Sequence, residues 1–402
     1  MLKSRGTIYL WLLCLLIVTL LTSYLSTIPI ILLLLLFLCE KKNAVKIKII
    51  RAFKNPITII LALYFLVHLV AYLCSINNNF ALKEMTQRLS YLILPIIIFG
   101  EKINFKQLKS VLLFFSKTVL IVLLLLALYH VILYHKGLSE FVYFGYKALA
   151  ISPFYYSIFI FAAMKINIEL KPKYWYVELA LLFLFLFLLG NRTSIVFISI
   201  YMFYIFFKEG KLTFLKKTVV MSLLLIIAGV ILVFSNSFRQ KTNILLKTLS
   251  FDVETIQTKN SITITRNTFE HRILIWSLAK DIIRENPLFG VGTSNYKKLL
   301  YEKYESVNFK AAIKDKFNTH NQYIEEILKF GLIGGGAFFL MIIGLVKQTY
   351  DKDVVFPVLL LVLVLSFFES IWYRNHGVLS ISFIIPLLYI YSEQKQRQKI
   401  ID

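Results

Sequence analysis

The ten residues VLIVLLLLAL (119–128) carry no polar side chain, and LLFLFLFLL (181–189) repeats the pattern. A helix needs about 20 mostly apolar residues to cross the hydrocarbon core of a bilayer. Helices and closed barrels satisfy their backbone hydrogen bonds there, and barrel strands alternate apolar with polar residues. Because these runs are continuous and the chain is 58% hydrophobic over 402 residues, the sequence predicts an all-α, polytopic integral membrane protein.

Twelve transmembrane helices are predicted along the chain. They cover 7–23, 26–39, 57–75, 89–100, 110–134, 151–165, 174–190, 193–207, 218–235, 321–346, 354–371 and 377–392. The ninth and tenth are separated by a long segment, 236–320, which is large enough to form a soluble subdomain. Three parts are therefore expected: nine helices in 1–235, a loop subdomain in 236–320, and three helices with a basic tail in 321–402.

The basic residues predict the orientation of these helices. With both termini in the cytoplasm, the inner segments hold 23 Lys and Arg, and the short outer loops hold six. Inner loops of membrane proteins are enriched in Lys and Arg, so the long loop is expected on the outer, periplasmic face. The net charge of +23 is spread over such loops, which argues against nucleic acid as a partner.

Two helices are predicted within the long loop. HRILIWSLAKDIIRE (271–285) has amphipathic spacing and is ended by Asn286 and Pro287. A turn-rich stretch, LFGVGTSNY (288–296), overlaps a second predicted helix over 294–305.

His320 stands at the head of a long apolar run, in THNQYIEEILKFGLIGGG (319–336). Thr319 and Gln322 have capping-box spacing, which predicts that His320 and Asn321 lie in the first helical turn. The positive end of a helix favours the neutral imidazole, and a neutral His at the water boundary suits a general base. The alternative is a polar interfacial residue that closes a helix.

Four arginines are expected at the outer face: Arg88, Arg192, Arg272 and Arg374. A charge at the membrane edge is costly and indicates function, and a guanidinium suits bidentate binding of phosphate. Snorkelling, membrane anchoring and a solvated surface charge are the alternatives for single residues. Together with His320 they suit a lipid-linked diphosphate. No Asp-rich motif predicts a metal, and no motif predicts a cofactor. Glu325, Glu326 and Lys329 are expected to form structural pairs.

Several motifs resemble those of bacterial O-antigen ligases and related polysaccharide polymerases. THNQYIEEILKFGLIGGG resembles the family's His-Asn segment with a Gly-x-x-Gly end. Three further segments are similar to its upstream loop motif, its membrane-edge Arg motif and its penultimate-loop segment: NPLFGVGTSNY (286–296), GNRTSI (190–195) and FFESIWYRNHGVLS (367–380). The twelve-helix topology extends the resemblance over essentially the whole chain.

This resemblance implies the fold of a polyprenyl-dependent membrane glycosyltransferase in the bacterial inner membrane. The donor would be a glycan on undecaprenyl diphosphate, and the acceptor would be a sugar hydroxyl of the lipid A core in the periplasm. Arg192 and Arg272 would contact the diphosphate, and His320 would act as base or orient the acceptor. Arg88, Asn321 and Arg374 are predicted to contribute to substrate binding. The reaction would invert the anomeric carbon without a metal.

Other functions stay open at this point. A polymerase that joins repeat units on the same lipid carrier would carry nearly the same features. A protein-glycosylating transferase is a third possibility, although such enzymes tend to have an extra C-terminal periplasmic domain. A transporter or flippase would place charges in mid-membrane and show inverted repeats. Here the polar residues cluster at the outer face and no repeat is visible.

Overall fold

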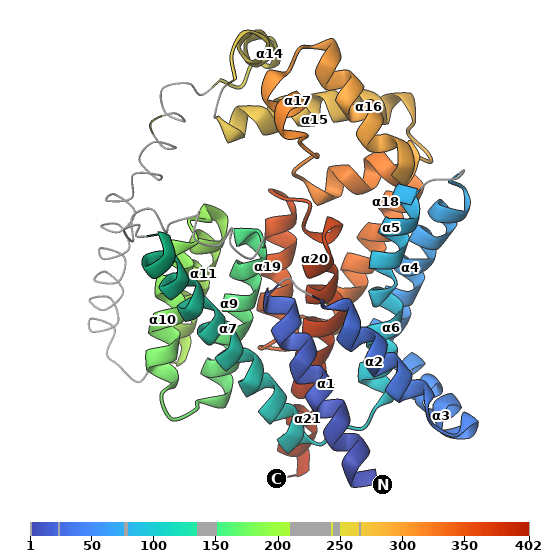
Figure 1. Ribbon diagram of the computed structural model, residues 1–402, viewed down its shortest axis with the longest axis vertical. Coiled ribbons are helices and arrows are strands. Elements are labelled where there is room, and N and C mark those ends of the chain that lie inside the picture. Colours follow the sequence, from blue (N-terminus) through green and yellow to red (C-terminus); the bar gives the residue numbers. More distant parts are fainter. Residues whose placement is uncertain are drawn as a thin grey trace. The chain divides into compact units, whose positions relative to one another are not determined.

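A computed structural model of the chain describes residues 2–22, 25–75, 79–134, 151–209, 243, 250–264 and 267–401. Every regular element within these ranges is a helix, and none is a strand (Figure 1). The prediction of an all-α protein is therefore confirmed for the part of the chain that the structure describes.

Five of the described helices are long and apolar enough to cross a membrane: Arg5–Thr22, Pro56–Leu73, Phe105–His130, Gln322–Thr349 and Asn375–Gln398. Four shorter apolar helices coincide with further predicted spans: Thr27–Leu38, Trp175–Leu188, Arg192–Ile205 and Phe356–Ser366. The predicted span 218–235 lies outside the described residues. A helical membrane protein is thus supported, and the count of twelve spans stays a prediction.

The chain divides into two compact units. The first unit comprises Met1–Pro29 and Lys106–Asn243, and the second comprises Ile30–Phe105 and Ile244–Asp402. Each unit therefore combines segments that are distant in the sequence. The predicted boundary between 235 and 236 lies outside the described residues, so it stays a prediction.

The first unit contains five described helices: α1 (Leu2–Thr22), α7 (Phe105–Tyr134), α9 (Pro153–Leu170), α10 (Trp175–Leu188) and α11 (Arg192–Glu209). Helix α9 is buried along most of its length, and the hydroxyl of Tyr156 donates to the carbonyl of Leu21 at 3.2 Å. A short connection joins α10 to α11, and Gly190 there has a φ of 65°. This turn places Arg192 at the start of α11.

The second unit contains the remaining described helices, including those of the loop. Before the loop lie α2 (Thr27–Leu38), whose first residues belong to the first unit, α3 (Lys42–Phe53), α4 (Pro56–Leu73), α5 (Asn79–Arg88) and α6 (Ser90–Gly100). After the loop lie α18 (Gln322–Thr349), α19 (Phe356–Ser366), η2 (Ile371–Tyr373), α20 (Asn375–Leu379), the π-helical η3 (Ser380–Ile384) and α21 (Ile385–Ile401). Helix α4 packs on α18, where Tyr64 contacts Phe338 and His68 contacts Phe330.

The loop subdomain consists of α14 (Val253–Ile262), α15 (Thr268–Glu285), α16 (Gly292–Ser306) and α17 (Lys310–Asp315), visible beside α18 in Figure 1. Both predicted loop helices are confirmed, each beginning two or three residues earlier than predicted. The side chain of Asn267 caps the start of α15 by accepting from the Phe269 and Glu270 amides. Residues such as Leu274, Tyr296 and Leu300 form one buried apolar core.

Helix α18 is broken where the loop subdomain meets it. Gly331 has φ 65° and ψ −163° inside this helix, a conformation that is essentially restricted to glycine. The 286–291 turn fills the break: the amides of Leu332 and Val291 donate to the carbonyls of Pro287 and Leu328. A Cβ at Gly331 would lie 2.2 Å from the Leu288 carbonyl oxygen, and one at Gly290 would lie 2.5 Å from the Gly331 nitrogen. Two glycines thus permit the backbones to touch.

Gly331→Ala and Gly290→Ala should each destabilise the protein, with Gly336→Ala as the matched control. A left-handed alanine costs about 1–2 kcal/mol, and the clash with backbone atoms adds to that. Gly336 lies in the same helix with nothing within 4 Å of its Cβ position, so alanine there should be neutral or slightly stabilising. Thermal unfolding of the detergent-solubilised variants measures this. Equal midpoints for all three variants would contradict the contact.

His271 is a buried packing residue of the loop subdomain. Its side chain contacts the rings of Phe309 and Phe317 at centroid distances of 5.3 and 5.6 Å. Burial, opposed in part by Asp315 and reinforced by Arg272, lowers the pKa of His271 to about 4. The native state therefore holds this imidazole neutral at pH 7.

Acid should loosen the loop subdomain through His271. The unfolded chain binds a proton near pH 6.5 and the native state near pH 4, so stability falls as the pH drops between these values. At pH 5 the loss is about 2 kcal/mol. Hydrogen exchange of α15 and α16 peptides, corrected for intrinsic rates, should accelerate from pH 7 to pH 5 in the wild type. His271→Phe should suppress that acceleration, and equal acid sensitivity of both proteins would count against this role.

Candidate functional site

His320 lies immediately before α18 rather than in its first turn. The N-cap of α18 is Asn321, whose side chain accepts from the amide of Ile324 at 3.1 Å. The predicted capping box of Thr319 and Gln322 is therefore wrong. It fails because Thr319 is buried and its hydroxyl instead lies 3.2 Å from the Glu325 carboxylate.

The backbone at His320 is unusual for a residue with a side chain. Its φ is 46°, in the left-handed region, and its amide donates to the side chain of Asn318 at 3.2 Å. Asn321 is buried and its side-chain oxygen is occupied in capping. The structure thus shows Asn321 fixing the end of α18, and its predicted contact with substrate stays a prediction.

The imidazole of His320 faces the connection between α19 and η2. Nδ1 lies 3.2 Å from Oε2 of Glu369, and the two side chains are 28% and 20% exposed. The ring of Phe317 packs edge-on against the imidazole at a centroid distance of 5.5 Å. The pair is therefore half-buried, with access from the surrounding medium.

Arg272 reaches the same connection from α15. Its guanidinium Nη2 donates to the carbonyl of Phe368 at 3.0 Å, next to Glu369. The exposed Arg374 precedes α20, close enough to influence the same carboxyl. The structure therefore brings together three of the predicted site residues, His320, Arg272 and Arg374, around residues 367–374, which we call the 367–374 connection.

Hydrogen bonds from several elements hold this connection in place. Trp276 of α15 donates its indole N–H to the carbonyl of Thr319 at 2.9 Å, and the Trp372 amide donates to the side chain of Gln322 at 2.8 Å. The hydroxyls of Thr319 and Ser370 lie 3.3 Å apart. The residues before α18 and the 367–374 connection are thus fastened to each other, which fixes His320 relative to Glu369.

Arg88 lies in a buried cluster of charges that contacts this connection at Tyr373. Its side chain is 1% exposed and lies 3.8 Å from Glu84, and it donates to the carbonyl of Tyr373 at 3.2 Å. Lys329 of α18 lies 2.9 Å from Glu84 and 2.7 Å from Glu325. The predicted structural pairing of Lys329 with Glu325 is confirmed. The predicted role of Arg88 in substrate binding stays a prediction, because this side chain lies inside the cluster.

Arg192 belongs to the first unit, where it is exposed at the start of α11. The preceding Asn191 is buried and its side-chain amide lies 3.4 Å from the hydroxyl of Ser157 on α9. The predicted position of Arg192 between two apolar helices is thus confirmed, and its contact with a diphosphate stays a prediction.

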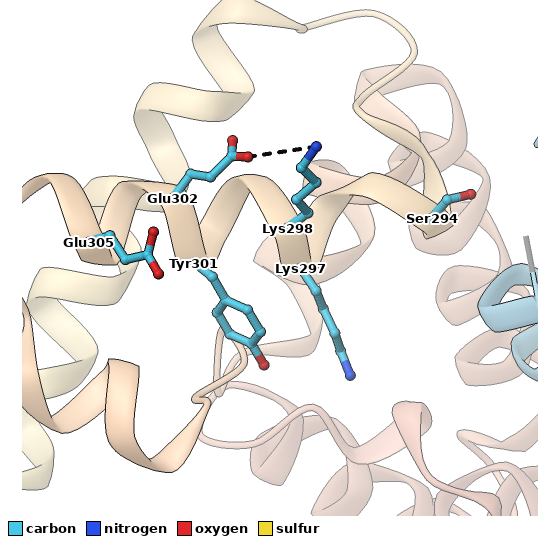
Figure 2. Close-up of a pocket in the computed structure, with 6 residues that line it drawn as sticks. All are labelled: Ser294, Lys297, Lys298, Tyr301, Glu302 and Glu305. Atoms are coloured by element: carbon cyan, nitrogen blue, oxygen red, sulfur yellow. Dashed lines mark ion pairs between the residues drawn. The ribbon is translucent and has the colours of Figure 1, made fainter.

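A depression of about 500 Å³ lies on the surface of α16. Figure 2 shows Lys297 and Tyr301 pointing to one side of this helix, while Lys298 and Glu302 pair on the other. The ammonium group of Lys297 lies 2.6 Å from the hydroxyl of Tyr373, one residue before Arg374. The polar side of α16 therefore adjoins the 367–374 connection.

The fold and this site define an α-helical membrane protein that presents a His–carboxylate pair with two arginines beside it. A family model described as O-antigen ligase matches residues 178–339. The predicted resemblance to O-antigen ligases and related polymerases is thereby confirmed over the matched residues. The match includes Arg192, Arg272 and His320, whereas Arg88 and Arg374 lie outside it. A comparison with curated proteins finds no match.

Two features of the site are absent from the sequence prediction. Glu369 is part of FFESIWYRNHG, but nothing in the spacing links it to His320, 49 residues earlier. Glu84 lies on α5 and pairs with Lys329, 245 residues later in the sequence. A buried Lys in an apolar helix is the one signal that could have indicated a missing acidic partner.

Lys329→Met should destabilise the protein strongly, with Lys298→Met as the control. Removing this buried cation leaves Glu325 without its ion pair and Glu84 with Arg88 alone, at 3.8 Å, which costs about 3–5 kcal/mol. Lys298 also pairs with a Glu at i+4, but its side chain is 77% exposed, and exposed pairs contribute little. The thermal midpoint in detergent should fall for Lys329→Met alone. A midpoint unchanged by either substitution would refute the contribution of the buried cluster.

Proposed function

We propose that the protein is an O-antigen ligase that transfers a glycan from undecaprenyl diphosphate to a sugar hydroxyl of the lipid A core. The reaction would take place at the periplasmic face of the inner membrane, with both chain termini in the cytoplasm. One observation carries the proposal, in a chain whose residues 178–339 match this family. His320 contacts Glu369, and Arg272 contacts the preceding residue, Phe368.

The proposed chemistry is an inverting displacement. The acceptor hydroxyl oxygen bonds to the anomeric carbon while the bond from that carbon to the diphosphate oxygen breaks. The electron pair leaves with undecaprenyl diphosphate, and the hydroxyl proton passes to Nε2 of His320. Arg272 would bind the diphosphate and offset its growing charge, as fixed cations do at a leaving group. Arg374, exposed at the same connection, is suited to a second contact.

For Arg192 the same role is proposed from the resemblance alone. A guanidinium binds phosphate oxygens through two parallel hydrogen bonds, and an ammonium group cannot. No metal is required in this scheme, because arginine side chains supply the positive charge. The depression on α16 adjoins the site and is available to the acceptor glycan.

Arg192→Ala, Arg272→Ala and His320→Ala should each abolish glycan transfer while the protein stays inserted and abundant. Arg192→Lys should also be poor. Arg397→Ala is the matched control, because Arg397 is 78% exposed on α21. Complementation of a deletion strain, read as lipopolysaccharide on a gel with the protein level in the membrane, measures this. Normal glycosylated lipopolysaccharide from all three alanine variants would end the proposal.

The deletion strain itself separates a ligase from a polymerase. A ligase deletion should yield bare lipid A core, with long glycan chains accumulating on undecaprenyl diphosphate. A polymerase deletion should yield core that carries a single repeat unit. That second outcome would replace the proposed ligase activity with polymerisation of repeat units on the same lipid carrier, and the roles of His320 and Arg272 could still hold.

A further inference from the structure

The pair of His320 and Glu369 has the geometry of a base held by a carboxylate. Nδ1 of His320 lies 3.2 Å from Oε2 of Glu369, which leaves Nε2 as the ring nitrogen for a substrate hydroxyl. In such an arrangement the carboxylate accepts the Nδ1–H and selects the tautomer with its lone pair on Nε2. Phe317 packs against the ring, so the imidazole has little freedom to rotate.

Glu369 is itself fixed and charged. Its Oε1 accepts from the amide of Ser370 at 3.3 Å. Burial raises the pKa of Glu369, but the hydrogen bond with His320 and the positive charges of Arg272 and Arg374 outweigh it and hold that pKa below its usual value. The carboxylate is therefore ionised at neutral pH, as a partner of an imidazolium must be.

We infer that Glu369 is a positioning residue for His320 in glycan transfer. This inference rests on the proposed function, in which His320 takes the acceptor proton. The carboxylate would orient Nε2 before the reaction and stabilise the imidazolium that forms when the hydroxyl proton arrives. Glu369 itself gains no proton and forms no bond to the sugar.

A purely structural role makes different predictions. Glu369 could act only as a counter-charge that fixes the 367–374 connection beside Arg272. In that case its loss would lower the stability of the protein and the amount of active enzyme, without moving the pH dependence of the remaining activity. A positioning role changes kcat and the pH profile in protein that is folded and binds its substrates normally.

The test measures initial transfer rates of purified protein in lipid nanodiscs, with undecaprenyl-diphosphate-linked glycan as donor and lipid A core as acceptor, from pH 5 to pH 9. Glu369→Gln retains the size of the side chain and removes its charge. Glu369→Asp retains the charge on a shorter side chain. Glu302→Gln is the matched control, because Glu302 is 51% exposed on α16. Thermal midpoints check the folding of each variant.

Glu369→Gln should lower kcat by about 100-fold or more, as loss of such a carboxylate does elsewhere, with KM nearly unchanged. The rise of kcat/KM with pH should move to lower pH, because the imidazolium has lost its counter-charge. The charged and titratable groups that interact with this pair are His271 and Arg272 on α15 and Arg374 before α20, and all remain in the variants. Glu369→Asp should recover part of the rate, and Glu302→Gln should match the wild type.

Two further results separate this inference from the proposed function. Adding Glu369→Gln to His320→Ala should cause no additional loss, because the carboxylate then has no ring to position. Full activity of Glu369→Gln with an unchanged pH profile, beside an inactive His320→Ala, would overturn the positioning role alone. An active His320→Ala would overturn the base assignment in the proposed function.

If Glu369→Gln does not fold, a Glu369→Asp variant with wild-type kcat and pH profile would overturn the inference, and a lowered kcat with a shifted profile would support it.

Discussion

The second unit depends on a lysine ammonium group that is buried in an apolar helix. Lys329 is 0% exposed and lies between Glu84 of α5 and Glu325 of its own helix. It also faces the rings of Tyr296 on α16 and Tyr373 in η2, at 4.5 and 5.3 Å from their centroids. An unpaired charge in such a place would be prohibitively costly. This one cation therefore requires α5, α16 and η2 to meet α18 at a single point.

The candidate site adjoins the buried lysine through the 367–374 connection, since Tyr373 of that connection faces Lys329. The break at Gly331 admits the 286–291 turn, which joins α15 to α16, so these two helices contact α18 at a fixed place. From there Trp276 and Arg272 hold the backbone at Thr319 and Phe368. Through these two hydrogen bonds, α15 of the loop subdomain fixes the position of the segment before α18 relative to the 367–374 connection. The side chains proposed to act on the substrate are carried on those segments.

The sequence was sufficient for features that depend on local composition. Continuous apolar runs predicted helices, and amphipathic spacing with Asn286 and Pro287 predicted the end of α15. The cap of α18 was misassigned because Thr319 has two competing uses, and only tertiary structure shows that its hydroxyl lies against Glu325. The partnership of His320 with Glu369 could not be predicted, since it depends on how α18 and the 367–374 connection are packed. The break at Gly331 could not be predicted for the same reason, because it depends on the 286–291 turn that fills it.

The left-handed backbone of His320 lowers the stability of the fold at the residue on whose side chain the proposed activity depends. A residue with a β-carbon pays about 1–2 kcal/mol for this conformation, whereas Gly or Asn adopts it more readily. Replacing the histidine by Gly or Asn would therefore relieve this backbone cost. At φ 46° the backbone cost and the imidazole belong to the same residue, so a substitution that raises the stability of the protein by relaxing this turn gives up the ring on which the proposed chemistry rests.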